Sequence, residues 1–115
     1  MATNYRLQIT FEPNIETFDA LSSIFKTQPL ELGDEIFSTW IYEIAEEQSH
    51  DFINFFLDKL ESKAEELANL NIKRENISLW KLYEYDQQCN MEFDPIRLKR
   101  IADNGITLCV SCWEK

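Results

Sequence analysis

The sequence predicts an α+β fold, a ferredoxin-like split βαβ sandwich with an added β-α unit at its N-terminus. Ser49 to Leu70 has apolar residues at three- and four-residue steps, the spacing of one helix face. Strand-like segments lie on both sides of it. The predicted order is β-α-β-α-β-β-α-β, and its last six elements form the split βαβ pattern. We therefore expect a five-stranded antiparallel sheet, ordered 1-5-2-4-3 along the chain numbering, with three helices on one face.

The N-terminal part supplies two strands and one helix. Tyr5 to Phe11 alternates apolar and polar residues, which indicates a half-buried strand. Pro13-Asn14 ends this strand and begins a helix, which finishes before Pro29 because the residue preceding a proline disfavours the α conformation. Leu30 to Glu35 is a predicted loop. Ile36 to Ile44 is rich in β-branched and aromatic residues and is predicted to be a central strand.

The long helix is the element on which the rest of the fold depends. Ser49 is its predicted N-cap, and Asp51 lies in its first turn, where the helix dipole favours an anion. Its apolar stripe is expected to pack on the sheet and consists of Ile53, Phe56, Leu57, Leu60, Ala64 and Leu67.

The C-terminal part supplies the remaining three strands and a helix. Ile77 to Tyr85 and Cys89 to Phe93 are separated by a polar turn and are predicted to form a hairpin. Asp94-Pro95 places a cap residue before a proline, the usual start of a helix. Asn104-Gly105 supplies its left-handed end. Ile106 to Cys112 alternates and is predicted to be the last strand.

Length and composition favour one globular domain over residues 1–115. The chain has 115 residues and 44% hydrophobic content, enough for a core without cross-links. No apolar run approaches the ~20 residues needed to span a bilayer, and the N-terminus lacks the apolar core of a secretory signal. Three cysteines are an odd number and suit a reducing compartment. We therefore expect a cytoplasmic protein.

No motif for catalysis or for a cofactor stands out. Cys109 and Cys112 form a C-x-x-C within a predicted strand, where positions three apart point to opposite faces. A zinc site would need two further ligands, and only Cys89 and His50 are candidates. His50 has no associated nucleophile motif, and two glycines cannot make a glycine-rich phosphate loop. We expect no enzyme activity, no metal and no cofactor.

The net charge of −10 is concentrated in the first half of the chain. Residues 1–58 hold 11 acids and 2 bases, whereas residues 59–115 hold 10 acids and 9 bases. Phosphate backbones and anionic lipids would repel this charge, so neither nucleic acid nor a membrane is an expected partner. A basic protein partner is favoured. The alternative is that the acidity only keeps the protein soluble.

The predicted strand order brings many acids to one end of the sheet. There the first three strands are expected to finish and the first two helices to begin. Helix dipoles explain part of this set, because Glu16 and Asp51 are expected in first turns. Five of the acids have no such local reason: Glu43, Glu46, Glu47, Glu84 and Asp86. The predicted partner-binding residues are Glu43, Glu46, Glu47, Glu84, Asp86, Glu12 and Asp51.

Two stretches resemble the bacterial family called domain of unknown function 4279. The first combines Pro29, Gly33-Asp34 and the strand Phe37 to Tyr42. The second comprises Asn90-Met91-Glu92-Phe93-Asp94, Leu98-Lys99, Ile101-Ala102 and Gly105-Ile106. The resemblance implies a small α/β domain and carries over no catalytic residue. Some members of that family are thought to be immunity proteins of bacterial toxin systems.

Acidity, small size and this resemblance together favour an immunity protein that binds and neutralises a toxin, such as a basic nuclease. An acidic surface can occupy the positive groove that a nuclease uses for phosphates. The alternative is a small-ligand-binding or regulatory domain without catalysis, which would use the open sheet face around Trp40 or Trp113. A small hydrolase or isomerase is the least favoured class.

Overall fold

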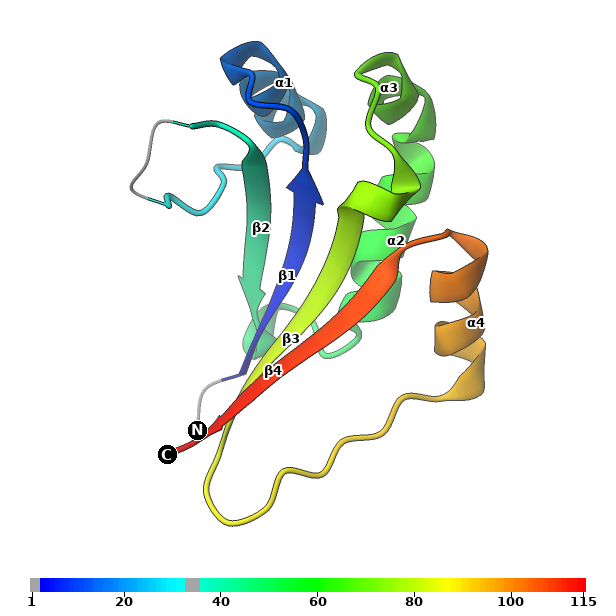
Figure 1. The fold of residues 1–115 in the computed structure, drawn as a ribbon. Helices are drawn as coiled ribbons and strands as arrows, with labels where there is room; N and C mark the ends of the chain where they lie inside the picture. The colour runs from blue at the N-terminus through cyan, green and yellow to red at the C-terminus, as the bar shows by residue number, and fades with distance from the viewer. Residues whose placement is uncertain (1–2, 33–35) are drawn as a thin grey trace.

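The computed structural model describes residues 3–32 and 36–115 and shows a single sheet with helices packed on one face (Figure 1). The predicted loop at Gly33-Asp34 lies outside the described residues. Two short 3-10 helices, η1 and η2, flank the central helices. The elements in chain order are β1 (Thr3–Thr10), α1 (Ile15–Phe25), β2 (Thr39–Ala45), η1 (Glu46–Gln48), α2 (Phe52–Ser62), α3 (Ala64–Asn69), η2 (Arg74–Asn76), β3 (Ile77–Tyr85), α4 (Pro95–Asp103) and β4 (Thr107–Glu114).

The described sheet has four strands in the order β2-β1-β3-β4. β1 is antiparallel to both of its neighbours, and β4 is parallel to β3. β2, β3 and β4 therefore run in one direction and finish at the same end of the sheet, which we call the carboxyl end. β1 finishes at the opposite end.

The core lies between the sheet and the helices. Tyr5, Leu7 and Ile9 are buried on one face of β1, whereas the alternate residues of that strand are only partly covered. The predicted helical stripe is buried at five of its six positions, with Phe56, among others, fully inaccessible. Its sixth position, Ala64, is exposed. The buried positions are Ile53, Phe56, Leu57, Leu60 and Leu67.

The predicted five-stranded antiparallel sheet in the order 1-5-2-4-3 with three helices is wrong. The chain is α+β, but its described sheet is mixed, has four strands, and is accompanied by four α-helices. Cys89 to Phe93 forms no strand. A hairpin partner would need a free side of β3, but β1 occupies one side and β4 the other. β4 reaches that place because α4 carries the chain back to run parallel to β3.

The long predicted helix is also divided. α2 ends at Ser62, and Lys63 leaves the helical region with φ −116° before α3 begins. The N-cap of α2 is Asp51 rather than Ser49, because the Asp51 carboxylate accepts a hydrogen bond from the backbone N–H of Asn54. β2 is shorter than predicted and begins at Thr39 rather than at Ile36.

The capping signals predicted for the other two helices are confirmed. The Asn14 side chain accepts from the backbone N–H of Glu16 at 2.8 Å at the start of α1. Asp94 caps α4 and is followed by the expected Pro95. Gly105 has a φ of 70°, the left-handed conformation expected after that helix. Within the described residues, no helix has the length and apolarity needed to cross a membrane.

Candidate protein-binding surface

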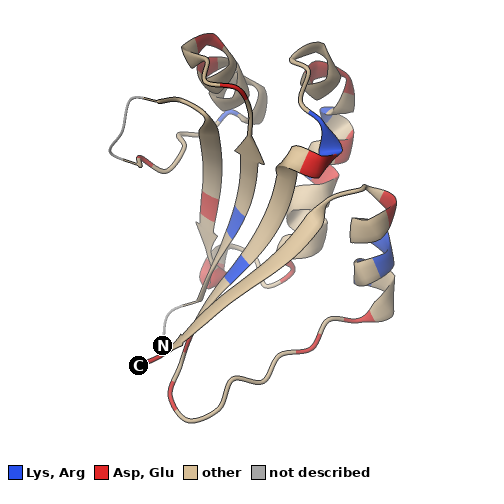
Figure 2. Cartoon of the chain, in the orientation of Figure 1, with Lys and Arg blue, Asp and Glu red and all other residues tan. Residues whose placement is uncertain are grey.

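Acidic residues gather at the carboxyl end of the sheet, where the three parallel strands finish (Figure 2). η1 follows β2 directly and contributes two acids, and the end of β3 and the turn after it contribute two more. The last residue of β4 adds a fifth. We call this set the acidic end: Glu46, Glu47, Glu84, Asp86 and Glu114.

The acidic end contains four of the seven predicted partner-binding residues. Glu47 and Asp86 are exposed, and Glu46 and Glu84 are partly exposed. Glu114 is not among the predicted residues. A parallel crossover through α4 places it there, opposite Tyr85 in the register of β3 and β4. The sequence analysis predicts a strand at Cys89 to Phe93, and a fold with that extra strand lacks this parallel crossover.

Few cations neutralise these carboxylates. Among the described residues, the one ion pair within the set joins Glu46 to His50, with the carboxylate Oε1 3.7 Å from the imidazole Nδ1. His50 is 82% exposed, and its ring carries charge only when protonated. The negative potential at this end is therefore largely uncompensated.

Glu43 lies close to the acidic end but already has a cation. It faces Arg6 across the β1–β2 pair, and the Arg6 Nε donates to the Glu43 Oε1 at 2.7 Å on the open face of the sheet. Both side chains are about three-quarters covered. This pair is locally neutral, so Glu43 contributes little net charge to a partner-binding surface.

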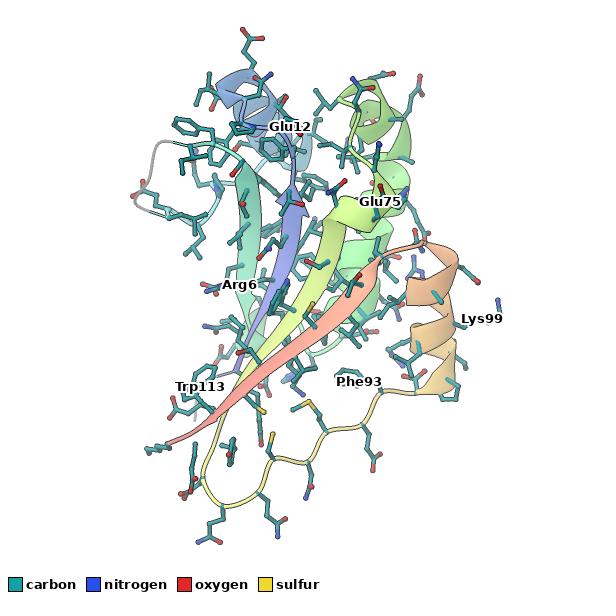
Figure 3. The ribbon with its side chains drawn as sticks, viewed as in Figure 1. Arg6, Glu12, Glu75, Phe93, Lys99 and Trp113 are labelled. Carbon is teal, nitrogen blue, oxygen red and sulfur yellow. The ribbon has the colours of Figure 1, made fainter. Side chains whose placement is uncertain are left out.

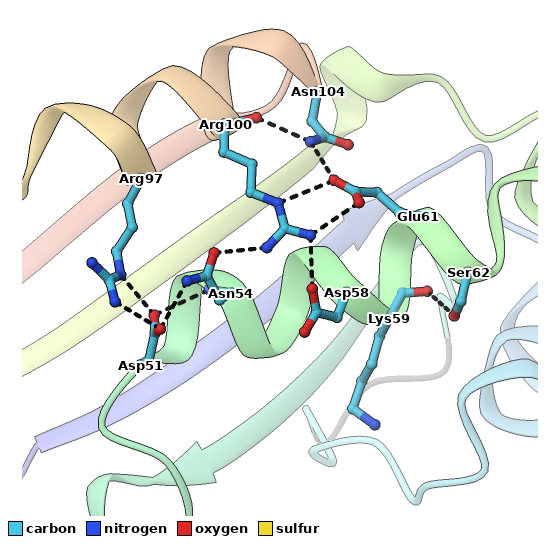
Figure 4. A network of polar contacts seen from close by, with 9 residues as sticks. All are labelled: Asp51, Asn54, Asp58, Lys59, Glu61, Ser62, Arg97, Arg100 and Asn104. Carbon is cyan, nitrogen blue, oxygen red and sulfur yellow. Dashed lines mark hydrogen bonds and ion pairs between the residues drawn. The ribbon is translucent and has the colours of Figure 1, made fainter.

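Asp51 is held in an ion network that joins α2 to α4 (Figure 4). Arg97 donates to it twice, from Nε to Oδ1 at 3.0 Å and from Nη2 to Oδ2 at 2.9 Å. The hydrogen bonds from Arg97, with those from Asn54, lower the pKa of the Asp51 carboxyl to about 2. Asp94 accepts from the same guanidinium at 2.7 Å. Asp51 therefore belongs to the packing of two helices.

Arg100 continues this network one turn further along α4. It donates to Asn54 and to Asp58, each at 2.7 Å, and reaches Glu61 with two nitrogens. The hydrogen bonds from Arg100 lower the pKa of the Glu61 carboxyl. We call the set the α2–α4 ion network: Asp51, Asn54, Asp58, Glu61, Arg97, Arg100 and Asn104.

The placement predicted for Glu12 is wrong. Because β1 is antiparallel to β2 and β3, the residues that follow it lie at the other end of the sheet. Figure 3 shows Glu12 and Glu75 at that end, away from Trp113 near the end of β4. Glu12 lines a hollow there together with Lys73 and is not part of the acidic end.

Tryptophans divide between the core and the open face. Trp40 is fully buried on the helix side, and its indole N–H donates to the Ser22 hydroxyl at 3.0 Å. The expected ligand site around Trp40 on the open face is therefore wrong. Trp113 is 44% exposed and is paired with Glu84 in the strand register, which places both on the open face. A large apolar group thus adjoins the acidic end.

The two cysteines of the C-x-x-C motif lie on opposite faces of β4, as predicted. Cys109 is paired with Trp80 on the open face, and Cys112 is paired with Tyr83 on the helix face. Both thiols are free. Burial raises the pKa of the Cys109 thiol.

The fold and this surface define a small α+β protein with a strongly acidic end to its sheet. In comparisons with known proteins, no family model matches the chain, and no curated protein or solved structure gives a significant match. The resemblance to domain of unknown function 4279 therefore stays an expectation, and function has to be argued from the surface itself.

Proposed function

We propose that this protein is an immunity protein that binds and neutralises a basic toxin, for example a nuclease, through the acidic end. One observation carries the proposal: five carboxylates gather where three strands finish, with His50 as their one ion-pair partner among the described residues. Like charges held together repel one another, so a basic partner would relieve this repulsion on binding.

The chemistry of a nuclease suits such a surface. A nuclease groove is lined with cations because it holds phosphates, and carboxylates can occupy the same positions. Complementary charge also steers the encounter, with association rates of about 10⁸ M⁻¹s⁻¹ or more at low salt. The same charge would repel nucleic acid and anionic lipid, so neither is proposed as a partner, and no catalytic role is proposed.

Trp113 supplies the apolar contact that a tight interface needs. Charged pairs at a rim mainly set the association rate, whereas buried aromatic anchors provide most of the binding energy. Trp113 is partly exposed and lies beside Glu84 on the open face. We therefore place the centre of the interface near this pair, with Glu46, Glu47 and Asp86 toward its rim.

The test is to replace Glu46, Glu47 and Asp86 by Lys together and to measure binding to the protein encoded by the neighbouring gene. We expect affinity to fall by about 100-fold or more, chiefly through the association rate. The matched control reverses three exposed acids outside the acidic end, Glu65, Glu66 and Glu75. The net charge change is identical. Equal losses in the two variants would mean that only total charge matters, and unchanged binding of a folded test variant would exclude this surface.

The alternative, a small-ligand-binding domain, is favoured by one feature beside α1 and β2. A hollow of about 570 Å³ lies there, lined in part by Phe18, Ser23 and Phe37. Phe37 has a φ of 54°, a conformation costly for an aromatic residue, and its ring makes an edge contact with Phe18. A ligand that raises the melting temperature of the native chain but not of a Ser23→Trp variant would support this alternative.

A further inference from the structure

β4 forms one edge of the sheet and is exposed along most of its length (Figure 1). Among the described residues, β3 is its one strand neighbour. Two of its larger apolar side chains are well exposed, Val110 at 40% and Trp113 at 44%. An edge strand carries a row of backbone N–H and C=O groups without strand partners, and such a row is a template for a further strand.

One hydrogen bond defines which backbone groups of β4 point outward. The Lys115 N–H donates to the Tyr85 carbonyl at 2.7 Å and continues the β3–β4 ladder. Backbone groups of successive strand residues point to opposite edges, so the odd-numbered residues of β4 bond to β3 and the even-numbered ones point away. The outward groups include those of Leu108, Val110 and Cys112. In the described part of the chain, these residues take part in no backbone hydrogen bond outside the regular elements.

The other edge of the sheet, on β2, is partly covered, whereas the β4 edge is not. The Leu30 N–H donates to the Ile41 carbonyl at 2.9 Å, so the segment before β2 lies along that edge. Natural proteins also protect exposed edges with lysine, proline or bulges. β4 has the sequence TLCVSCWE, without lysine or proline, and its one charged residue is Glu114 at the end. The β4 edge therefore fits a strand that is nearly uncharged.

We propose that β4 pairs antiparallel with β4 of a second copy of this chain and joins the two sheets across a two-fold axis. The strand that the edge requires is extended, exposed and nearly uncharged, and β4 of every copy has these properties. A basic partner would be directed to the acidic end instead, since β4 offers it a single carboxylate. Because the β2 edge is partly covered, the assembly closes as a dimer.

The sequence of β4 complements itself when the two-fold axis passes through Val110. The outward N–H and C=O groups of Val110 then bond to those of Val110 in the second copy. Trp113 lies opposite Thr107, an aromatic side chain beside a β-branched one, which is a favourable cross-strand pair. Leu108 lies opposite Cys112 on the helix face. The exposed Val110 and Trp113 each gain an apolar or β-branched neighbour in this register.

This arrangement also keeps the acidic ends of the two copies apart. Glu114 lies four positions from the axis at Val110, so the two copies of Glu114 are about 25 Å apart along the joined strands. The Debye length at physiological ionic strength is about 8 Å, so their repulsion is largely screened. Added salt should therefore not weaken the dimer, whereas it should weaken binding of a basic partner to the acidic end.

The test measures the mass of the full chain by sedimentation from about 1 µM to about 1 mM, the range in which small interfaces associate. Dithiothreitol is present, so disulfides between copies do not contribute. We expect the mass to rise from one chain to two. Val110→Pro removes an outward N–H and no bond to β3, and it should weaken association by about 10-fold or more. Val110→Thr keeps the N–H and the branched shape and is the matched control, with an expected change of less than about threefold.

Amide hydrogen exchange, followed by NMR at the concentration where the native chain is dimeric, locates the interface. The N–H groups of Leu108 and Cys112 should be protected in the native chain and should exchange about 10-fold faster in Val110→Pro. The N–H groups of Cys109 and Ser111 bond to β3 and should be protected in both, which also shows that the variant is folded.

Four outcomes would overturn the proposal. A native chain that stays monomeric over the whole range does not pair through β4. A dimer that is unchanged in folded Val110→Pro, or whose Leu108 and Cys112 amides exchange freely, uses another surface. A mass that grows beyond two chains excludes the closed two-fold pair. Protection of these amides only after a basic protein is added would show that the edge receives a foreign strand and not a second copy.

Discussion

The acids of the α2–α4 ion network and those of the acidic end have opposite surroundings. Asp51, Asp58 and Glu61 each accept a hydrogen bond from an arginine of α4. Glu47 and Asp86 form no ion pair with any cation among the described residues. Carboxylates therefore stabilise the fold in the α2–α4 ion network, whereas the carboxylates of the acidic end repel one another.

This difference separates structural acids from candidate binding acids. A carboxylate with a fixed cation partner is already compensated and has little to gain from a second one. A group of carboxylates without partners gains by binding a basic surface. Net charge alone could not make this distinction, because both kinds of acid contribute equally to −10. Substitutions in the two sets of acids, and changes of pH and salt, test this distinction.

Removing Arg100 should produce the largest change in stability. Arg100→Met keeps the aliphatic stem but removes the guanidinium that donates to both Asp58 and Glu61. We expect the free energy of unfolding to fall by about 1–2 kcal/mol, since hydrogen bonds to charged groups are stronger than neutral ones but these are partly exposed. Urea denaturation measures the change.

Lys99→Met on the same helix is the matched control. Within the described part of the chain, Lys99 pairs with Asp103 alone and is 76% exposed, so its loss should cost less than about 0.5 kcal/mol. Similar losses for the two variants would mean that the network contributes no more than an ordinary surface pair.

The network should also weaken in acid. Asp51 has a pKa of about 2 in the folded protein, below its ordinary value of 3.8. A lowered pKa contributes stability that is present above pH 3.8 and is lost as the pH falls toward 2. After allowance for its partial exposure, we expect this contribution to be about 1 kcal/mol.

Asp51→Asn isolates this charge, because asparagine is an equally good N-cap. The variant should be less stable than the native chain at pH 7, and most of the difference should be lost by about pH 2. Chemical denaturation at a series of pH values gives both curves. A difference that stays constant down to this pH would show that the charge of Asp51 has no stabilising role.

Local structure is largely predictable from this sequence, whereas strand pairing is not. Asn14 and Asp94 are recognisable as helix starts because capping depends on residues a few positions away. Ile77 to Tyr85 is predicted with its observed bounds. The segment Cys89 to Phe93 has a composition compatible with a strand, but a strand needs a neighbour, and α4 and β4 decide which neighbour β3 receives. The strand that pairs with β3 is therefore determined by residues distant in the sequence.

In the candidate surface, too, some features follow from local sequence and others depend on strand pairing. Glu46, Glu47, Glu84 and Asp86 come together because strands β2 and β3 finish at one end in both the predicted and the observed sheet. Glu12 is misplaced because the direction of β1 depends on its pairing. The role of Asp51 does have a local signal. A polar stripe at Asp51, Asn54, Asp58 and Glu61 matches the spacing of a second stripe at Arg97, Arg100 and Asn104.

Neutralising the acidic end should have a small effect of the opposite sign. Glu46→Gln, Glu47→Gln and Asp86→Asn together remove three charges that lack a permanent cation. We expect the free energy of unfolding to stay the same or to rise by up to about 0.5 kcal/mol, because repulsion is relieved and no strong hydrogen bond is lost. A loss of more than about 1 kcal/mol in urea denaturation would mean that these acids are structural.

Salt should remove even this small difference between the neutralised variant and the native chain. The Debye length is about 10 Å at 0.1 M ionic strength and about 3 Å at 1 M, so repulsion between exposed carboxylates is screened at the higher value. The native chain should therefore gain a few tenths of a kcal/mol more than the triple variant when salt is raised. Sodium chloride, paired with urea as the uncharged denaturant, keeps other ionic effects small. A gap that persists at about 1 M salt would have to come from contacts other than charge, and the acidic end would then lose the uncompensated repulsion on which its proposed role depends.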